Sequence, residues 1–248
     1  MTLYEIETTF VQVLDGDLHI DAYLAQPKGL GPFPAIIVFQ EIFGVNAHIR
    51  DVTEQIAKEG YVAIAPAIFQ RQAPGFETGY TPEDVALGRT YKVQTKAAEL
   101  IGDTQATLNY LQLLSNVNPD AIGTIGFCFG GHVAYLAATL PEVKATASFY
   151  GAGIATLTPG GGPPTITLTD KIQGTVYAFF GDRDASIPAT EVKQIADALT
   201  ANRIPHQIFH YPADHGFFCD RRGSYHPESA ADAWTQVLRL FRETLTGD

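Results

Sequence analysis

Apolar runs alternate with helix-like segments along this chain, and this alternation restricts the fold more than any other feature. The runs AIIVFQ (35–40) and YVAIAPAIF (61–69) indicate buried strands. Between them, HIRDVTEQIAKEG (48–60) has apolar residues at helical spacing and ends at a glycine. Strands that are apolar on both faces and separated by helices form a parallel sheet covered on both sides. The pattern therefore predicts an α/β fold.

The same alternation continues to the end of the chain. It predicts further strands at 121–127, 144–151, 174–182 and 206–212, and helices at 92–114, 130–140, 189–202 and 227–245. Near the start, LHIDAYLAQP (18–27) alternates in polarity and ends at a proline, so we expect it to form a hairpin with 7–13. Because no linker divides the chain, residues 1–248 are expected to form one α/β domain with a mostly parallel central sheet and helices on both faces.

Composition excludes several classes of protein. A net charge of −11 argues against nucleic-acid binding, which needs clustered Lys and Arg. Two cysteines cannot form a disulfide framework. There is no signal-peptide pattern at the N-terminus and no apolar run near the roughly 20 residues of a membrane span. We therefore expect a cytoplasmic protein that does not bind membranes.

Polar residues gather just after the predicted strands. In open parallel sheets the ligand crevice lies at the carboxyl ends of the strands. The strand endings here are QEIFG, GFCFGG, FYGAG, GDRDASIP and ADHGFF. Two Gly- and Pro-rich stretches, 70–83 and 151–164, are long enough to be functional loops, and we expect a substrate pocket beneath them.

The stretch GFCFGG (126–131) places Cys128 between a strand and a helix. This form is typical of a nucleophile elbow, in which glycines permit a sharp turn that exposes the nucleophile. The start of a helix also favours an anion, which here would be the thiolate. Taken alone, the stretch also fits a small buried cysteine.

Two later strand endings supply an acid and a base. The order Cys128, Asp184, His215 is the order nucleophile, acid, histidine of α/β-hydrolases, and the chemistry requires all three groups. Asp182 is the alternative acid. Its place directly after a glycine favours a turn role, so we expect Asp184 to hold the histidine.

Six motifs in order resemble the dienelactone hydrolase family, also called carboxymethylenebutenolidases. They are QEIFGVNAHIRDV, RQAPG, GFCFGG, FYG, GDRDASIP and YPADHGFFCD. The resemblance implies an α/β-hydrolase fold, a cysteine nucleophile that opens lactones and related esters, and no metal or organic cofactor. Carried over by position, Cys128 is the nucleophile, Asp184 the acid and His215 the base.

The resemblance also assigns a role to Glu41, the glutamate of QEIFG, as a contact of the resting thiol that keeps it protonated. The alternative is a solvated loop carboxylate. The backbone amides of Ile42 and Phe129 are expected to form the oxyanion hole, since one follows the third strand and the other follows the nucleophile.

The chain departs from the family at the positions that grip a substrate carboxylate. Cys219 occupies the place of one arginine and is expected to be a small buried residue. Arg89 is close to the place of the other but a fraction of a turn out of step. Arg221, Arg222 or Arg89 could bind a substrate carboxylate by another route. Tyr150 is a candidate pocket wall or an ordinary core residue. The substrate is therefore expected to be a small lactone or ester that need not be the family's dienelactone.

Other residues and other functions are weaker candidates. His132 is expected to pack or cap, and His48, His206 and His210 have no cysteine or carboxylate at metal-ligand spacing, so no metal site is expected. The alternatives to a cysteine hydrolase are a peptidase or C–C hydrolase of the same fold and a non-catalytic binding protein. Cys128, with Glu41, argues against the first, and the intact triad argues against the second. A monomer or small homo-oligomer is expected.

Overall fold

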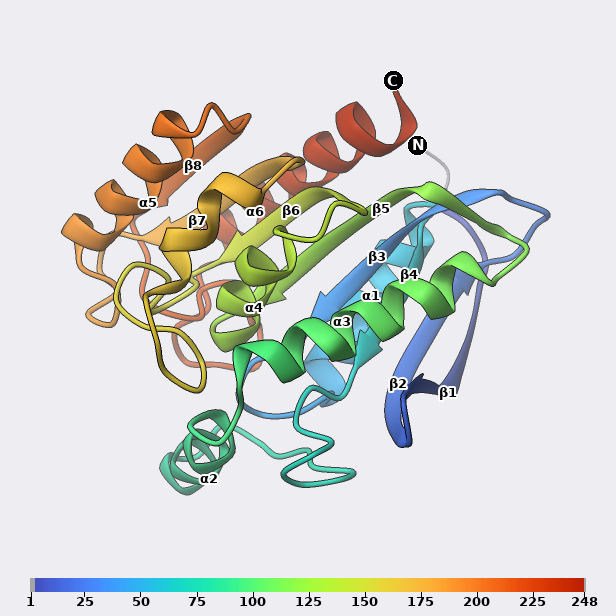
Figure 1. The fold of residues 1–248 in the computed structure, drawn as a ribbon, viewed down its shortest axis with the longest axis horizontal. Helices are drawn as coiled ribbons and strands as arrows, with labels where there is room; N and C mark the ends of the chain where they lie inside the picture. Colours follow the sequence, from blue (N-terminus) through green and yellow to red (C-terminus); the bar gives the residue numbers. More distant parts are fainter. Residues whose placement is uncertain (1–2, 248) are drawn as a thin grey trace.

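Eight strands form one sheet in the order β1-β2-β4-β3-β5-β6-β7-β8 in this computed structural model, which describes residues 3–247 (Figure 1). The strands are β1 (Ile6–Asp15), β2 (Leu18–Pro27), β3 (Phe33–Phe39), β4 (Val62–Pro66), β5 (Val117–Phe127), β6 (Val143–Phe149), β7 (Thr175–Gly181) and β8 (His206–Tyr211). β1 pairs antiparallel with β2, and β2 with β4, while the pairs from β4 through β8 are parallel. The predicted hairpin and the mostly parallel sheet are confirmed.

Helices cover both faces of the sheet, as the continuous apolar strands predicted. They are α1 (Ala47–Lys58), α2 (Pro82–Lys92), α3 (Ala97–Gln112), α4 (Phe129–Ala137), α5 (Ala189–Ala201) and α6 (Pro227–Phe241), with a 3₁₀ segment η1 (Thr165–Lys171) and a π-helical turn η2 (Arg242–Thr246). α3 and α4 pack in one apolar cluster, and α1 and α6 in another, on opposite sides of the sheet (Figure 1). α1 buries Ile49, Val52 and Ile56, which recur at helical spacing.

The helix predicted at 92–114 is present, but it is shorter than expected and begins only at Ala97. α2 ends at Lys92, and α3 begins at Ala97 after Lys96 takes an extended conformation. No glycine or proline marks the break. The N–H of Ala97 donates to the carbonyl of Pro159 at 2.8 Å, so a distant loop satisfies the first turn of α3.

The parallel strands bring their carboxyl ends to one edge of the sheet. Just beyond these ends lie Glu41 (after β3), Cys128 (β5), Tyr150 (β6), Asp184 (β7) and His215 (β8). Strand ends that are far apart in the sequence therefore lie close together, where the ligand crevice of an open parallel sheet is expected. Among residues 3–247, none of the helices combines the length and apolar character that a bilayer crossing requires.

Candidate active site

Cys128 lies on a sharp turn between β5 and α4. Its backbone has φ 56° and ψ −115°, a conformation that costs a non-glycine residue energy and is held by the surrounding structure. Its N–H donates to the carbonyl of Phe149 at 3.0 Å. A Cβ on Gly126 would lie 1.9 Å from the carbonyl oxygen of Gly130, so the turn requires glycine there. The elbow predicted from GFCFGG is therefore present, with a half-buried thiol.

Asp184, rather than Asp182, contacts the histidine. Oδ2 of Asp184 lies 2.6 Å from Nδ1 of His215, and Oδ1 accepts a hydrogen bond from the Ser186 N–H at 2.8 Å. The Asp184 side chain is buried. Asp182 instead lies 3.0 Å from Nδ1 of His210, and both of these side chains are exposed. Of the two candidate acids, the structure brings only Asp184 to His215.

His215 and Cys128 form a coupled pair. Burial alone would lower the pKa of His215, but the charges of Cys128 and Asp184 and its hydrogen bonds to both raise it to about 10. Burial would raise the pKa of the Cys128 thiol, but the charge and hydrogen bond of His215 outweigh it and lower that pKa. The helix start at Cys128 favours an anion as well. The pair therefore favours thiolate and imidazolium, the form suited to nucleophilic attack.

Two backbone amides lie beside the elbow in the positions predicted for an oxyanion hole. Phe129 is the first residue of α4, where an N–H has no partner within the helix, and Ile42 lies in the turn after β3. Within residues 3–247, neither N–H donates to a backbone carbonyl. Donors of this kind can hold the oxyanion of a tetrahedral intermediate.

Glu41 contacts an arginine. Its side chain is buried, and Oε1 accepts a hydrogen bond from Arg222 at 2.8 Å. Oε2 has no partner among the described residues. The resemblance implied a contact between Glu41 and the thiol, whereas the structure pairs this carboxylate with Arg222. Its charge nevertheless acts on Cys128 and opposes His215 by raising the thiol pKa.

A cavity of about 210 Å³ opens onto the thiol. It is lined by Ile42, Phe43, Val85, Arg89, Lys92, Cys128, Ala152, Ser186, His215 and Arg222. Ala152 comes from the predicted loop 151–164, but the other cover is α2 rather than the loop 70–83. A Cβ on Gly88 would lie 2.2 Å from the carbonyl oxygen of Ile42, so glycine allows α2 to pack directly over the site.

Three cations line this cavity: Arg89 and Arg222, which the sequence indicated as candidate contacts of a substrate carboxylate, and Lys92, which it did not indicate. Arg89 lies in the cavity despite its displaced register, and Lys92, three residues further along α2, lies beside it. In the described part of the chain, neither forms a salt bridge with a carboxylate. Arg222 is the third. The helical i, i+3 spacing could have identified Lys92, whereas nothing in the sequence separates Arg222 from Arg221.

Arg221 and Tyr150 lie outside the cavity lining. Arg221 forms an exposed ion pair with Asp51. Tyr150 is fully buried, and its ring lies 5.1 Å from that of His215 in an edge-to-face contact. Tyr150 therefore packs against the imidazole of His215 and does not line the cavity.

Two further residues of the sequence interpretation are buried. His132 bonds to Thr165 Oγ1 at 2.7 Å and to the carbonyl of Ala152 at 3.0 Å, and burial lowers its pKa to about 4. It packs the loop against α4, as expected. Cys219 is buried and donates to the Tyr80 hydroxyl at 3.3 Å, and burial, with the charge of Glu41, raises its pKa to about 11.

Comparison with known proteins places this chain in a family. The sequence matches the Dienelactone hydrolase family over residues 20–245. Proteins named "Putative carboxymethylenebutenolidase" are similar to it. The one from Synechocystis sp. is 60% identical over 242 residues, which cover 97% of this chain and 98% of that protein. The one from Escherichia coli is 33% identical over 231 residues, which cover 91% and 83%.

A solved structure agrees with these relatives. The crystal structure of a "Putative Dienelactone Hydrolase" from Klebsiella pneumoniae superimposes with a TM-score of 0.87 at 32% identity and covers 96% of this chain and 99% of that one. The fold is the α/β-hydrolase fold that the motif order predicted. Cys128, Asp184 and His215 follow β5, β7 and β8, in the same chain order as the nucleophile, acid and histidine of that fold. The chain belongs to the dienelactone hydrolase family.

Proposed function

We propose that this chain hydrolyses a negatively charged lactone or carboxylic ester, with Cys128 as the nucleophile. The observation that carries the proposal is the 2.6 Å contact between buried Asp184 and His215, which lines the 210 Å³ cavity together with Cys128 and lowers the pKa of its thiol. Family membership and relatives named carboxymethylenebutenolidase support the ester- or lactone-hydrolase part.

The first half of the reaction forms a thioester. The Cys128 thiolate attacks the carbonyl carbon, and the Ile42 and Phe129 amides bind the oxyanion that develops. When the tetrahedral intermediate collapses, the bond to the leaving oxygen breaks, and the His215 imidazolium gives that oxygen its proton. In a lactone the leaving hydroxyl stays attached to the acyl group, so the ring opens on the enzyme.

The second half releases the acid. Neutral His215 takes a proton from water, whose oxygen attacks the thioester carbonyl carbon within the same oxyanion hole. Collapse breaks the carbon–sulfur bond and restores the thiolate beside the imidazolium. Asp184 holds the imidazole in one orientation throughout, because its buried carboxylate accepts a hydrogen bond from the Nδ1–H of His215.

The charge of the cavity supports an anionic substrate. Arg89 and Lys92 have no carboxylate partner among the described residues, whereas Arg222 is held by Glu41. A substrate carboxylate at the α2 side of the cavity would pair with the two unpaired cations. In the family pattern, an arginine at the position of Cys219 binds the substrate carboxylate. In this chain, cations of α2 would bind it instead.

Turnover of p-nitrophenyl acetate and of a panel of cis- and trans-lactones, before and after iodoacetamide, tests the proposal. Peptide mapping confirms which cysteine is modified. We expect turnover to fall in proportion to alkylation at Cys128. Full turnover after complete alkylation of Cys128 would contradict a cysteine mechanism, and no turnover of any ester or lactone would favour the non-catalytic alternative.

A further inference from the structure

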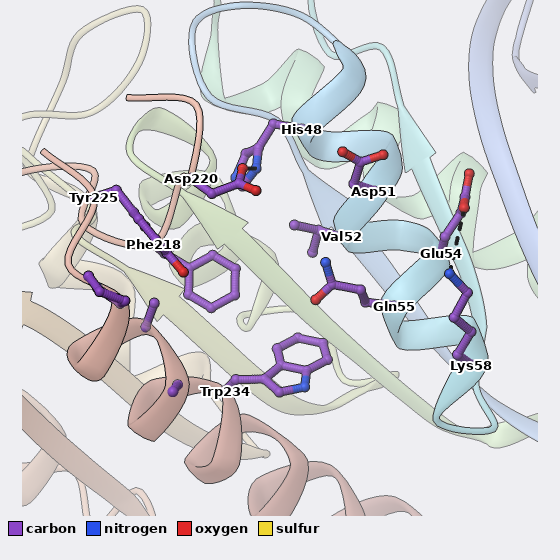
Figure 2. Close-up of a pocket in the computed structure, with 13 residues that line it drawn as sticks. His48, Asp51, Val52, Glu54, Gln55, Lys58, Phe218, Asp220, Tyr225 and Trp234 are labelled. Carbon is purple, nitrogen blue, oxygen red and sulfur yellow. Dashed lines mark ion pairs between the residues drawn. The ribbon is translucent and has the colours of Figure 1, made fainter. Parts of the chain in front are cut away.

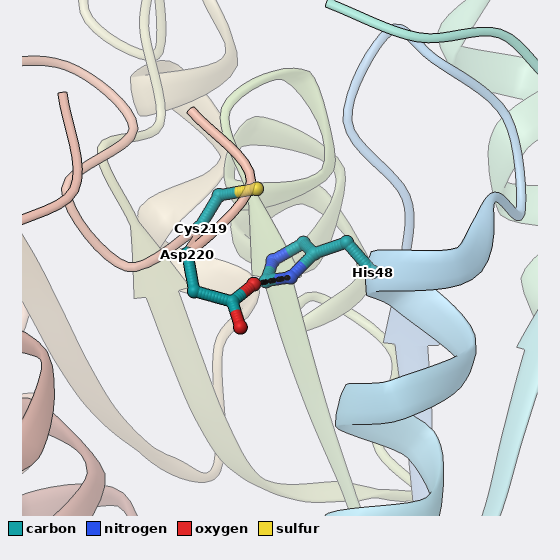
Figure 3. Close-up of side chains that lie close together, drawn as sticks. All are labelled: His48, Cys219 and Asp220. Carbon is teal, nitrogen blue, oxygen red and sulfur yellow. Dashed lines mark ion pairs between the residues drawn. The ribbon is translucent and has the colours of Figure 1, made fainter. Parts of the chain in front are cut away.

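His48, Cys219 and Asp220 come together outside the triad. His48 lies on α1, and the other two lie on the loop after β8 that also carries His215. One potential ligand atom from each lies within 4.8 Å of the others (Figure 3). The expectation that His48 has no cysteine or carboxylate partner is therefore wrong, because the fold supplies what the sequence spacing does not show.

The imidazole of His48 has no hydrogen bond among residues 3–247. Only 4% of the residue is exposed, and Nε2 is buried without a partner. Nδ1 lies 3.7 Å from Oδ1 of Asp220, beyond hydrogen-bond distance. A buried polar group left unpaired is destabilising, so such a group in a native structure calls for an explanation such as a bound ion.

Packing fixes the direction of this ring. Its centroid lies 6.1 Å from that of Phe127 and 6.4 Å from that of Phe218. Figure 3 shows the ring pointing from α1 toward Cys219 and Asp220. The ring is therefore held in place, with Nδ1 facing Asp220 and Nε2 left without a hydrogen bond among the described residues.

We propose that His48, Cys219 and Asp220 bind a divalent transition-metal ion of the zinc type. Imidazole, thiolate and carboxylate together are typical zinc ligands, and the thiolate selects against magnesium and calcium. Ligand atoms around tetrahedral zinc are about 3.5 Å apart. The cluster must therefore contract by roughly an ångström, and the exposed Asp220 side chain is free to turn inward.

The surroundings of the cluster fit an ion. His48 and Asp220 line a cavity of about 400 Å³ between α1 and α6. Figure 2 shows them at one end of it and Trp234 at the other. The cavity gives an entry path and room for water as a fourth ligand. On binding, the Cys219 proton leaves to solvent, and the Tyr80 hydroxyl, 3.3 Å from Sγ, can turn to donate to the thiolate.

A bound ion would connect α1 to the loop after β8, which carries His215 and Arg222. The Arg222 N–H donates to the carbonyl of Cys219 at 3.1 Å, and Cys219 donates its own N–H to Gly216 beside His215. The ion would thus stabilise the segment that presents both His215 and Arg222. The inference does not depend on the proposed hydrolysis, because it can be tested in protein that lacks the Cys128 thiol.

Cobalt(II) titration of chelator-treated, full-length Cys128→Ser protein tests the proposal. Cys219 is then the one remaining cysteine, so a sulfur-to-cobalt charge-transfer band reports on it alone. We expect one equivalent to bind with this band and zinc to displace it. Adding Cys219→Ser should abolish the band, and adding His48→Gln or Asp220→Asn should weaken binding by about tenfold or more.

Two controls keep the result decisive. His210→Gln removes an exposed histidine with an aspartate partner but no cysteine, and it should leave cobalt affinity unchanged. Asp220 is exposed, so Asp220→Asn tests the site even if His48→Gln fails to fold. Absence of the band in Cys128→Ser protein, its persistence without Cys219, or unchanged affinity in Asp220→Asn would overturn the proposal.

Discussion

Asp184 and His215 are joined by a 2.6 Å contact between Oδ2 and Nδ1, and the carboxylate in this contact is almost completely buried. Asp182, only two residues earlier, is exposed and faces a different histidine, His210. A two-residue difference in sequence thus separates a candidate catalytic acid from a surface carboxylate.

Asp184→Asn should lower kcat/KM by about 10²-fold or more. The amide removes the charge that stabilises the imidazolium and no longer fixes its tautomer. Asp182→Asn is the matched control and should retain activity close to that of the parent. Steady-state ester turnover of the two variants measures the difference, and equal losses would contradict the assignment of the acid.

His215→Gln should move the pH dependence of Cys128 alkylation to higher pH. Burial and Glu41 raise the thiol pKa, while the charge and hydrogen bond of His215, and to a smaller extent the charge of Lys92, lower it. Loss of His215 therefore leaves the raising effects dominant. Less thiolate then exists at neutral pH. Iodoacetamide rates from about pH 5 to about pH 10 give the midpoint, and His210→Gln should not move it. A midpoint unchanged by His215→Gln would show that the pair is not coupled.

Glu41→Gln should make the Cys128 thiol more reactive. The Glu41 carboxylate raises the thiol pKa, so replacing it with a neutral amide lowers that pKa. A fall of one in the pKa increases the thiolate fraction by about tenfold. The gain appears below the parent midpoint, where the parent thiol is still mainly protonated. Alkylation rates near that pH test this, with Glu77→Gln, a surface carboxylate paired with Arg50, as control. An unchanged rate would rule out control of the thiol by Glu41.

Lys92→Met should raise KM for an anionic ester by about tenfold, since a charge-assisted contact contributes roughly 1.5–3 kcal/mol. KM for neutral p-nitrophenyl acetate should change little. Lys96→Met is the control, because Lys96 pairs with Glu99 and does not line the cavity. An equal rise in KM for both esters would show that Lys92 does not read substrate charge.

Local pattern was enough to predict the sheet and the elbow. Continuous apolar runs, helical spacing and the glycines around Cys128 are each encoded within a few residues, and the structure confirms them. The rule that ligands bind at the carboxyl ends of parallel strands then predicted which polar side chains would lie close together. It could not separate neighbours within one loop from position alone, and turn chemistry was needed to favour Asp184 over Asp182.

The remaining features depend on contacts between distant segments. At the start of α3, the N–H of Ala97 donates to the carbonyl of Pro159 in a distant loop. Arg222 reaches Glu41 across most of the chain, so sequence spacing cannot reveal it. His48 meets Cys219 for the same reason. These pairings follow from the fold and are not written in any local motif.

Acylation of Cys128 during turnover is the step on which the proposed reaction depends. Acid-quenching the protein within the first turnovers of an ester substrate and mapping its peptides by mass spectrometry tests this directly. We predict the acyl mass on the Cys128 peptide, and neither the adduct nor turnover in Cys128→Ala. An acyl group on another residue, or parent-level turnover by Cys128→Ala, would show that Cys128 is not the nucleophile.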